Sequence, residues 1–129
     1  MSSWVLDASA LLAFIKSEPG VERVAGALMT GAAMSAVNLS EVIAKLADEG
    51  VPGSAIRHSI ETVGLDIAEF DADDALVAGL LRPSTRGAGL SLGDRACLAL
   101  AQGSGAPVLT TDRAWASLDL DGIEVELVR

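Results

Sequence analysis

The chain has 129 residues, half of them hydrophobic, and its 18 acidic residues against 9 basic ones give a formal net charge of −9. A domain of this length can bury a core without disulfides or a structural metal. The negative charge excludes a protein that grips nucleic acid over a broad basic face, so any polyanionic substrate must be held locally. Aromatic residues make up only 3% of the chain and Tyr is absent, so the core must consist of Ala, Val, Leu and Ile.

Cysteine content and hydropathy indicate the compartment. Cys97 is the single cysteine, which excludes an internal disulfide framework and a multi-cysteine zinc site and suits a reducing cytosol. No basic segment precedes the first apolar run, and no apolar stretch approaches the twenty residues of a membrane span. We therefore expect a soluble cytoplasmic protein with no membrane attachment.

The first apolar run, Trp4 to Leu6, ends abruptly at the carboxylate of Asp7. Its residue types predict a strand that is buried on both faces, as in a parallel sheet, and the residues from Ala8 to Ile15 predict a helix. Ligands of open α/β sheets bind beyond the carboxyl ends of the strands. Asp7 is therefore either a site residue or simply the N-cap of the helix, and by itself the pattern favours neither.

The rest of the chain alternates between strand and helix patterns and shows no repeat or linker. Further helices are predicted at 21–29, from 38–41 to 50, at 55–63 after a capping Ser54, at 71–81, at 95–102 and at 112–115. Further strands are predicted at 32–37, 65–70, 107–110 and 123–127. The last strand alternates cleanly and should lie at a sheet edge, whereas 82–89 reads as a flexible loop. We predict one α/β domain over residues 1–129.

Four acidic residues stand at the openings of predicted helices: Asp7, Glu41, Asp94 and Asp112. Capping accounts for each one separately, since Asn38-x-x-Glu41 and Ser91-x-x-Asp94 resemble capping boxes and the other two can be plain N-caps.

Capping does not explain why several of these acids would come together in the fold. If the strands before Asp7 and Asp112 are parallel neighbours, both carboxylates emerge at one edge of the sheet, near the other helix openings. Carboxylates clustered in this way take up protons unless a cation neutralises them. Mg2+ prefers such oxygen ligands and retains several waters, and one or two such ions can activate water for attack on a phosphodiester.

The ordered set of motifs resembles the PIN-domain ribonucleases, and more narrowly the VapC-type toxins of toxin-antitoxin pairs. The motifs are Asp7-x-Ser9, Asn38-x-x-Glu41, the run from Leu90 to Arg95, and Thr110-Thr111-Asp112. The resemblance covers residues 3 to 128, and it lies in the order of the motifs rather than in any single one.

This resemblance implies a PIN-like three-layer sandwich, in which helices flank a central, mostly parallel sheet of about five strands. It also implies endonucleolytic cleavage of RNA with Mg2+ or Mn2+ as cofactor. Asp7, Glu41, Asp94 and Asp112 match the catalytic and metal-binding acidic quartet. The polar residues that match neighbours orienting these acids or their waters are Ser9, Asn38 and Thr110. The partners implied are RNA, a cognate VapB-like antitoxin protein, and a second copy of the chain in a homodimer.

Several other residues have a structural and a functional interpretation. Arg82, Arg86 and Arg95 are candidate RNA contacts, although the first two suit a solvated loop and Arg95 suits an ion pair. The structural interpretation is favoured for three more residues: a surface or partly buried position for His58, a buried apolar role for Cys97 and core packing for Trp115.

Three alternative functions remain open. A phosphatase-like domain would use Asp7 as nucleophile, but that chemistry usually requires a second Asp two residues on, where this chain has Ser9. An inactive binding module would bind no divalent metal. A housekeeping nuclease would have no antitoxin reading frame beside its gene.

Overall fold

A five-stranded parallel sheet forms the centre of the computed structural model, which describes residues 2–129. Its strands are β1 (Trp4–Leu6), β2 (Ala32–Ser35), β3 (Asp66–Ala68), β4 (Val108–Thr110) and β5 (Val125–Leu127). They are ordered β3-β2-β1-β4-β5, and every neighbouring pair is parallel. The predicted α/β class is therefore confirmed, while residue 1 of the predicted 1–129 domain lies outside the described residues.

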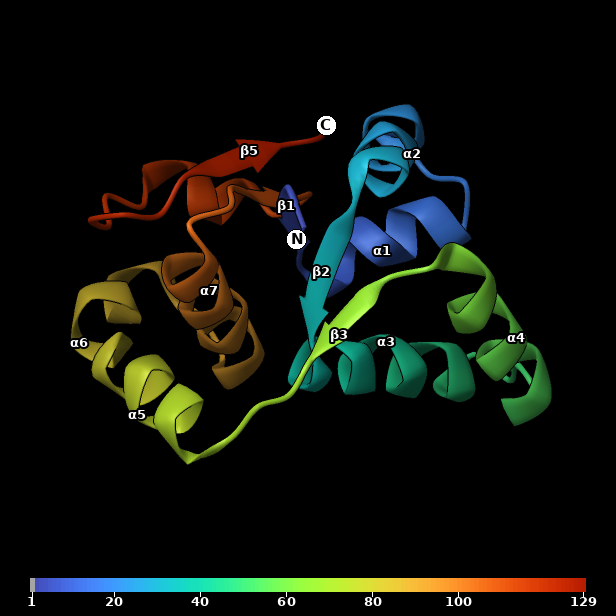
Figure 1. The fold of residues 1–129 in the computed structure, drawn as a ribbon, viewed down its shortest axis with the longest axis horizontal. Coiled ribbons are helices and arrows are strands. Elements are labelled where there is room, and N and C mark those ends of the chain that lie inside the picture. The colour runs from blue at the N-terminus through green and yellow to red at the C-terminus, as the bar shows by residue number, and fades with distance from the viewer. Residues whose placement is uncertain (1) are drawn as a thin grey trace.

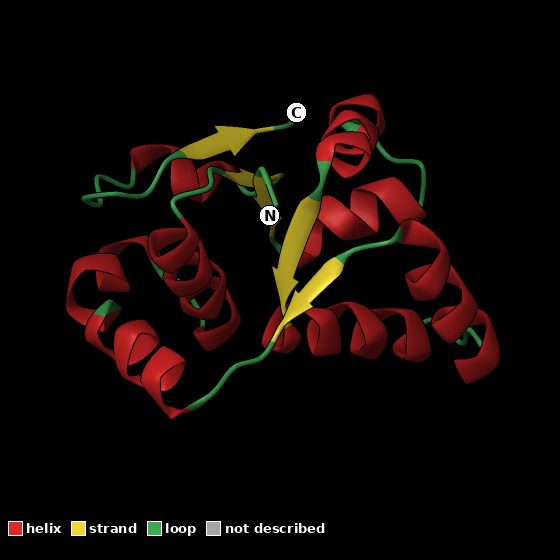
Figure 2. Ribbon diagram, viewed as in Figure 1, coloured by secondary structure: helices red, strands yellow, loops and turns green. Residues whose placement is uncertain are grey.

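Helices cover the sheet on both faces (Figures 1 and 2). One group of helices comprises α1 (Ala8–Ile15), α2 (Val21–Thr30), α3 (Ala36–Asp48) and α4 (Gly53–Val63). The other comprises α5 (Ala72–Leu80), α6 (Arg82–Thr85) and α7 (Leu92–Ser104), with the short 3-10 helices η1 (Arg86–Ala88) and η2 (Arg113–Ser117). These three layers match the predicted sandwich.

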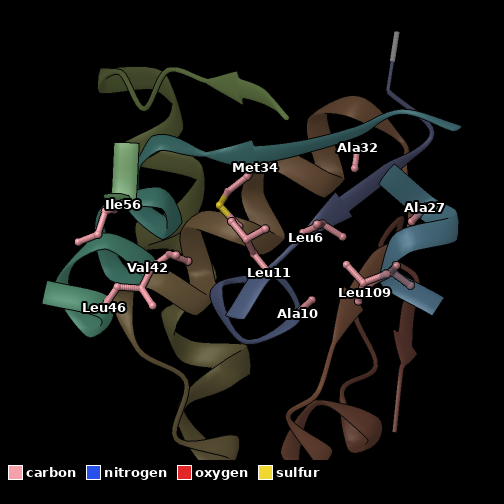
Figure 3. Packing of buried hydrophobic residues seen from close by; sticks show 11 residues of the cluster. Leu6, Ala10, Leu11, Ala27, Ala32, Met34, Val42, Leu46, Ile56 and Leu109 are labelled. Atoms are coloured by element: carbon pink, nitrogen blue, oxygen red, sulfur yellow. The ribbon is translucent and has the colours of Figure 1, made fainter. Parts of the chain in front are cut away.

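Successive residues of the central strands point to opposite faces of the sheet and pack into two separate hydrophobic cores. Leu6 and Leu109, which lie opposite each other in the β1–β4 register, pack with Leu11 and Met34 under α1 to α4 (Figure 3). On the other face, Val5 and Val108 form the next pair and pack under α7 and η2. Because β1 lies in the middle of the sheet and is covered on both faces, its sequence is apolar throughout, as predicted.

The second strand ends earlier than predicted. Strand β2 stops at Ser35, whose hydroxyl oxygen accepts a hydrogen bond from the backbone N–H of Val37 at 3.2 Å and so caps α3. Val37 and Asn38 therefore lie inside the helix, and the predicted Asn38-x-x-Glu41 capping box is wrong. The predicted cap at Ser54 is also wrong, because α4 begins at Gly53 after Pro52.

The segment 82–89 is helical rather than a flexible loop. Pro83 lies in the first turn of α6, where its missing N–H costs no helical hydrogen bond. The hydroxyl of Thr85, which is fully buried, donates to the carbonyl of Leu81 at 2.8 Å. The basic residues of this segment are therefore held on short helices.

The last strand lies at the sheet edge, as predicted, and its three residues are half-buried. No helix within residues 2–129 has the length and apolar character needed to cross a membrane.

Candidate active site

Asp7 and Asp112 lie at the carboxyl edge of the sheet because the strands before them, β1 and β4, are parallel neighbours. Both acids also cap helices: Asp7 Oδ1 accepts from the Ala10 N–H at 2.8 Å and Asp112 Oδ1 from the Ala114 N–H at 3.0 Å. Each of the two acids therefore caps a helix and also lies at the sheet edge where the site was predicted.

The carboxyl group of Asp7 is buried in a cradle of hydroxyls, with only 4% of the residue exposed. The Ser9 hydroxyl lies 2.7 Å from Asp7 Oδ1 and 2.9 Å from Oδ2, and the Thr110 hydroxyl donates to Oδ2. Burial raises the pKa of Asp7 from 3.8 to about 6, although these hydrogen bonds and that of Ala10 oppose the rise. Asp7 is thus a carboxyl whose charge is poorly solvated and would be stabilised by a nearby cation.

The same hydroxyls connect the ends of β1 and β4. Ser9 Oγ accepts from the Thr111 N–H at 3.0 Å, and Thr110 Oγ1 accepts from the Asp112 N–H at 3.0 Å. Ser9 Oγ and Thr110 Oγ1 lie 3.3 Å apart. Both residues thus contact Asp7, where the resemblance predicted polar neighbours that orient the acids.

Asp94 is held at the first turn of α7 by a capping box. Its Oδ2 accepts from the Ser91 N–H at 3.0 Å, while the Asp94 N–H donates to Ser91 Oγ at 3.2 Å. The negative charge of Asp94 adds to the raised pKa of Asp7. The capping role predicted for Asp94 is confirmed, and its carboxylate is close enough to Asp7 to repel it.

Glu41 is held by Asn38, one of the residues that the resemblance matches to polar neighbours orienting the acids. The side-chain amide Nδ2 of Asn38 donates to Glu41 Oε1 at 2.8 Å and to the carbonyl of Gly93 at 2.9 Å. These two hydrogen bonds link α3 to the first turn of α7. Asn38 itself is only 1% exposed. Gly93, the neighbour of Asp94, was predicted only as part of the run from Leu90 to Arg95 and without a role of its own, because its significance depends on a side chain from another helix.

The buried thiol of Cys97 lies within electrostatic range of three of the four acids. Burial raises its pKa well above the usual value, and the charges of Asp7, Asp94 and Glu41 raise it further. Asp7 directly follows β1, Asp94 lies in α7 and Glu41 lies in α3, so three separate segments place a negative charge near this thiol. Asp112 is not among these charges; it adjoins the group through its backbone contact with Thr110.

The donor chemistry fits a hard divalent cation that keeps part of its water shell. Within residues 2–129, no three His, Cys, Asp or Glu side chains converge tightly enough to form a cage for an ion. Mg2+ does not require one, because it commonly binds through one or two carboxylates and several waters. The single Ser9 hydroxyl hydrogen can serve only one oxygen of Asp7 at a time, which leaves a lone pair on the other.

The three candidate RNA contacts lie in different settings. Arg82 and Arg86 are exposed on α6 and η1. Arg95 is half-buried and donates from Nη1 to the carbonyl of Ala78 at 3.0 Å. The predicted ion pair of Arg95 is wrong: the salt bridges among residues 2–129 do not include it.

The structural interpretations of the remaining residues are confirmed. Cys97 is fully buried and Trp115 is 1% exposed within the α7 core. His58 is exposed on α4.

Solved structures with the same fold include toxin-antitoxin complexes. DNA-bound VapBC from Salmonella typhimurium matches over 100% of both chains with a TM-score of 0.78 and 19% identity. VapBC2 from Rickettsia felis, bound to a promoter DNA fragment, matches over 96% of this chain and 97% of that one, with a TM-score of 0.73 and 16% identity. VapBC-1 from nontypeable Haemophilus influenzae matches over 97% of both chains, with a TM-score of 0.72 and 17% identity.

A search of curated proteins found no match. The family model of the PIN domain, in contrast, matches residues 4–120, which include all four acids of the site. With this match and the parallel five-stranded sheet, the chain belongs to the PIN domain family.

Proposed function

We propose that this chain is a divalent-metal-dependent endoribonuclease and the toxin of a VapBC-type toxin-antitoxin pair. The observation that carries the proposal is the burial of Asp7 at the sheet edge within electrostatic reach of Asp94. A buried carboxyl beside a second one is unfavourable without a cation and favourable with one. Membership of the PIN domain family, a family of nucleases, supports the reaction class.

The four acids Asp7, Glu41, Asp94 and Asp112 would together hold Mg2+ or Mn2+. When bound, the ion supplies Lewis-acid stabilisation of phosphodiester hydrolysis and lowers the pKa of water. Ser9 and Thr110 fix the orientation of the Asp7 carboxyl, and Asn38 fixes that of Glu41.

RNA is held by a few arginine side chains rather than by a broad basic face. Arg82 and Arg86 are exposed and can pair with phosphates of the RNA, although Arg82 Nη1 also donates to the carbonyl of Leu90 at 3.5 Å. Arg95 takes part only if its guanidinium leaves the carbonyl of Ala78. The net charge of −9 makes such binding local and sensitive to salt.

The proposed partner is a VapB-like antitoxin, and the proposed assembly is a homodimer or a heteromer with that antitoxin in the cytoplasm. The support is the fold shared with chains of VapBC complexes. A small reading frame immediately upstream, whose product copurifies with this chain and inhibits cleavage, would distinguish the toxin from a housekeeping nuclease. The toxin assignment would be contradicted if no such reading frame lay beside the gene and if the protein, purified without any inhibitor, did not impair growth when expressed.

The nuclease is tested by incubating purified protein with single-stranded RNA in Mg2+, Mn2+ or EDTA. We expect internal cleavage with either metal and none in EDTA. Asp94→Asn should abolish cleavage without unfolding the protein, because the amide oxygen of Asn can still accept the Ser91 N–H. Asp121→Asn, at an exposed residue far along the chain, is the matched control and should cleave normally. Full activity of Asp94→Asn, or in EDTA, would refute the proposal.

A further inference from the structure

Gly93 lies in the first turn of α7 directly against the Glu41 carboxylate. A Cβ atom built on Gly93 would overlap Oε1, Oε2 and Cδ of Glu41. Gly93 is buried, and its φ lies outside the positive region in which glycine is favoured. The backbone therefore gives no reason for glycine at this position, whereas the neighbouring carboxylate does.

The other helical glycines show that this contact is particular to Gly93. A Cβ built on Gly26 in α2, on Gly79 in α5 or on Gly103 in α7 would meet nothing within 4 Å. Glycine in a helix interior normally reduces stability relative to alanine. Gly93 therefore lowers the stability of α7 relative to alanine, but its lack of a side chain leaves room for the carboxylate of Glu41 from α3.

The Glu41 carboxylate is also held by Asn38. The buried amide of Asn38 donates one hydrogen to Glu41 Oε1 and the other to the carbonyl of Gly93 itself. Glu41, Asn38 and Gly93 therefore form one interlocking contact between α3 and α7. Since Gly93 immediately precedes Asp94, this contact joins Glu41 to the turn of α7 that carries Asp94.

We propose that Gly93 is a positioning residue, whose lack of a side chain lets Glu41 lie against α7 beside Asp94. Its consequence for metal binding rests on the proposed function. Because the carboxylate is the flexible end of its side chain, alanine at this position displaces Glu41 and breaks its bond to Asn38 while leaving the helices in place. Gly93→Ala should thus impair the site far more than the fold.

Thermal unfolding tests the contact without any metal or RNA. In a Glu41→Ala background, we expect Gly93→Ala to raise Tm, as Gly26→Ala should in the wild-type protein, because the clash is gone and alanine favours the helix. With Glu41 present, Gly93→Ala should give no such gain. The same Tm change with and without Glu41 would overturn the proposal.

Electron paramagnetic resonance titration with Mn2+ tests the consequence for the site. Gly93→Ala should weaken Mn2+ binding about tenfold or more, as typical for loss of a group that orients a ligand. In a Glu41→Ala background, Gly93→Ala should weaken Mn2+ binding no further, because the two substitutions remove the same interaction. Gly26→Ala should bind as the wild-type protein does.

Two outcomes of this titration separate the possible failures. Wild-type affinity in Gly93→Ala, or an effect that adds fully to that of Glu41→Ala, would overturn the positioning role. A wild-type protein that binds no Mn2+ would refute the metal-dependent function, while the thermal comparison would still decide whether Gly93 positions Glu41.

Discussion

Replacing Asp7 with Asn should make the metal-free protein more stable at neutral pH. Burial raises the pKa of Asp7 from 3.8 to about 6, and each pKa unit corresponds to 1.36 kcal/mol. The ionised carboxylate is therefore disfavoured in the folded state by about 3 kcal/mol. Asn carries no charge, its oxygen can still accept the Ala10 N–H, and the hydroxyl oxygens of Ser9 and Thr110 can accept from its amide.

The pH dependence identifies the cause. Between about pH 4 and pH 6, folded wild-type protein retains a proton on Asp7 that the unfolded chain has released. This proton is lost from the folded state as pH rises, so Asp7 lowers the free energy of unfolding through this range and no further above it. In urea titrations with EDTA at pH 4 to 8, the advantage of Asp7→Asn should grow by about 3 kcal/mol and then level off. Parallel curves for the two proteins would refute the reasoning.

Mg2+ should reverse the ranking. A ligand that binds only the folded state stabilises it by RT ln(1 + [L]/Kd), so wild-type protein should gain stability at pH 7.5 when Mg2+ is added. Asp7→Asn should gain little. Equal gains would show that Asp7 does not bind the ion.

Further predictions concern the core and the surface. Cys97 is fully buried and the pKa of its thiol is raised, so it should react with a disulfide reagent only after denaturation; rapid labelling of the native protein would contradict its burial. Trp115→Ala should cost about 3–5 kcal/mol in urea titrations, as for other large core residues, and a cost below about 1 kcal/mol would contradict the burial of Trp115 in the core. Arg23→Ala should cost about 1 kcal/mol or less, because its pairing with Glu126 and stacking on Trp4 take place near solvent; a larger loss would contradict this.

Local signals in the sequence predicted the elements whose causes are local. The run from Trp4 to Leu6 is apolar because β1 is central, and Ser91 and Asp94 form a capping box within four residues. The sheet edge carrying Asp7 and Asp112 followed from the parallel pairing of their strands. The fold class and the neighbourhood of these acids could therefore be predicted from residue types and spacing.

The failures have tertiary causes. Asn38 resembles a capping residue, but its amide is occupied by Glu41 and by a carbonyl 55 residues away, which spacing along the chain cannot reveal. Pro83 and its neighbouring glycines suggested a loop, whereas the buried hydroxyl of Thr85 bonds back to Leu81 and helps to hold a helix. Gly93 is part of the run from Leu90 to Arg95, but its own role could not be predicted, because the reason for glycine lies in α3.

Anomalous diffraction from crystals soaked in Mn2+ tests the central claim most directly. We expect an anomalous peak at the sheet edge, next to the carboxylates of Asp7, Asp94 and Glu41. The peak should vanish in crystals of Asp94→Asn. A well-ordered crystal with no peak at these carboxylates, or with Mn2+ bound only elsewhere, would contradict it.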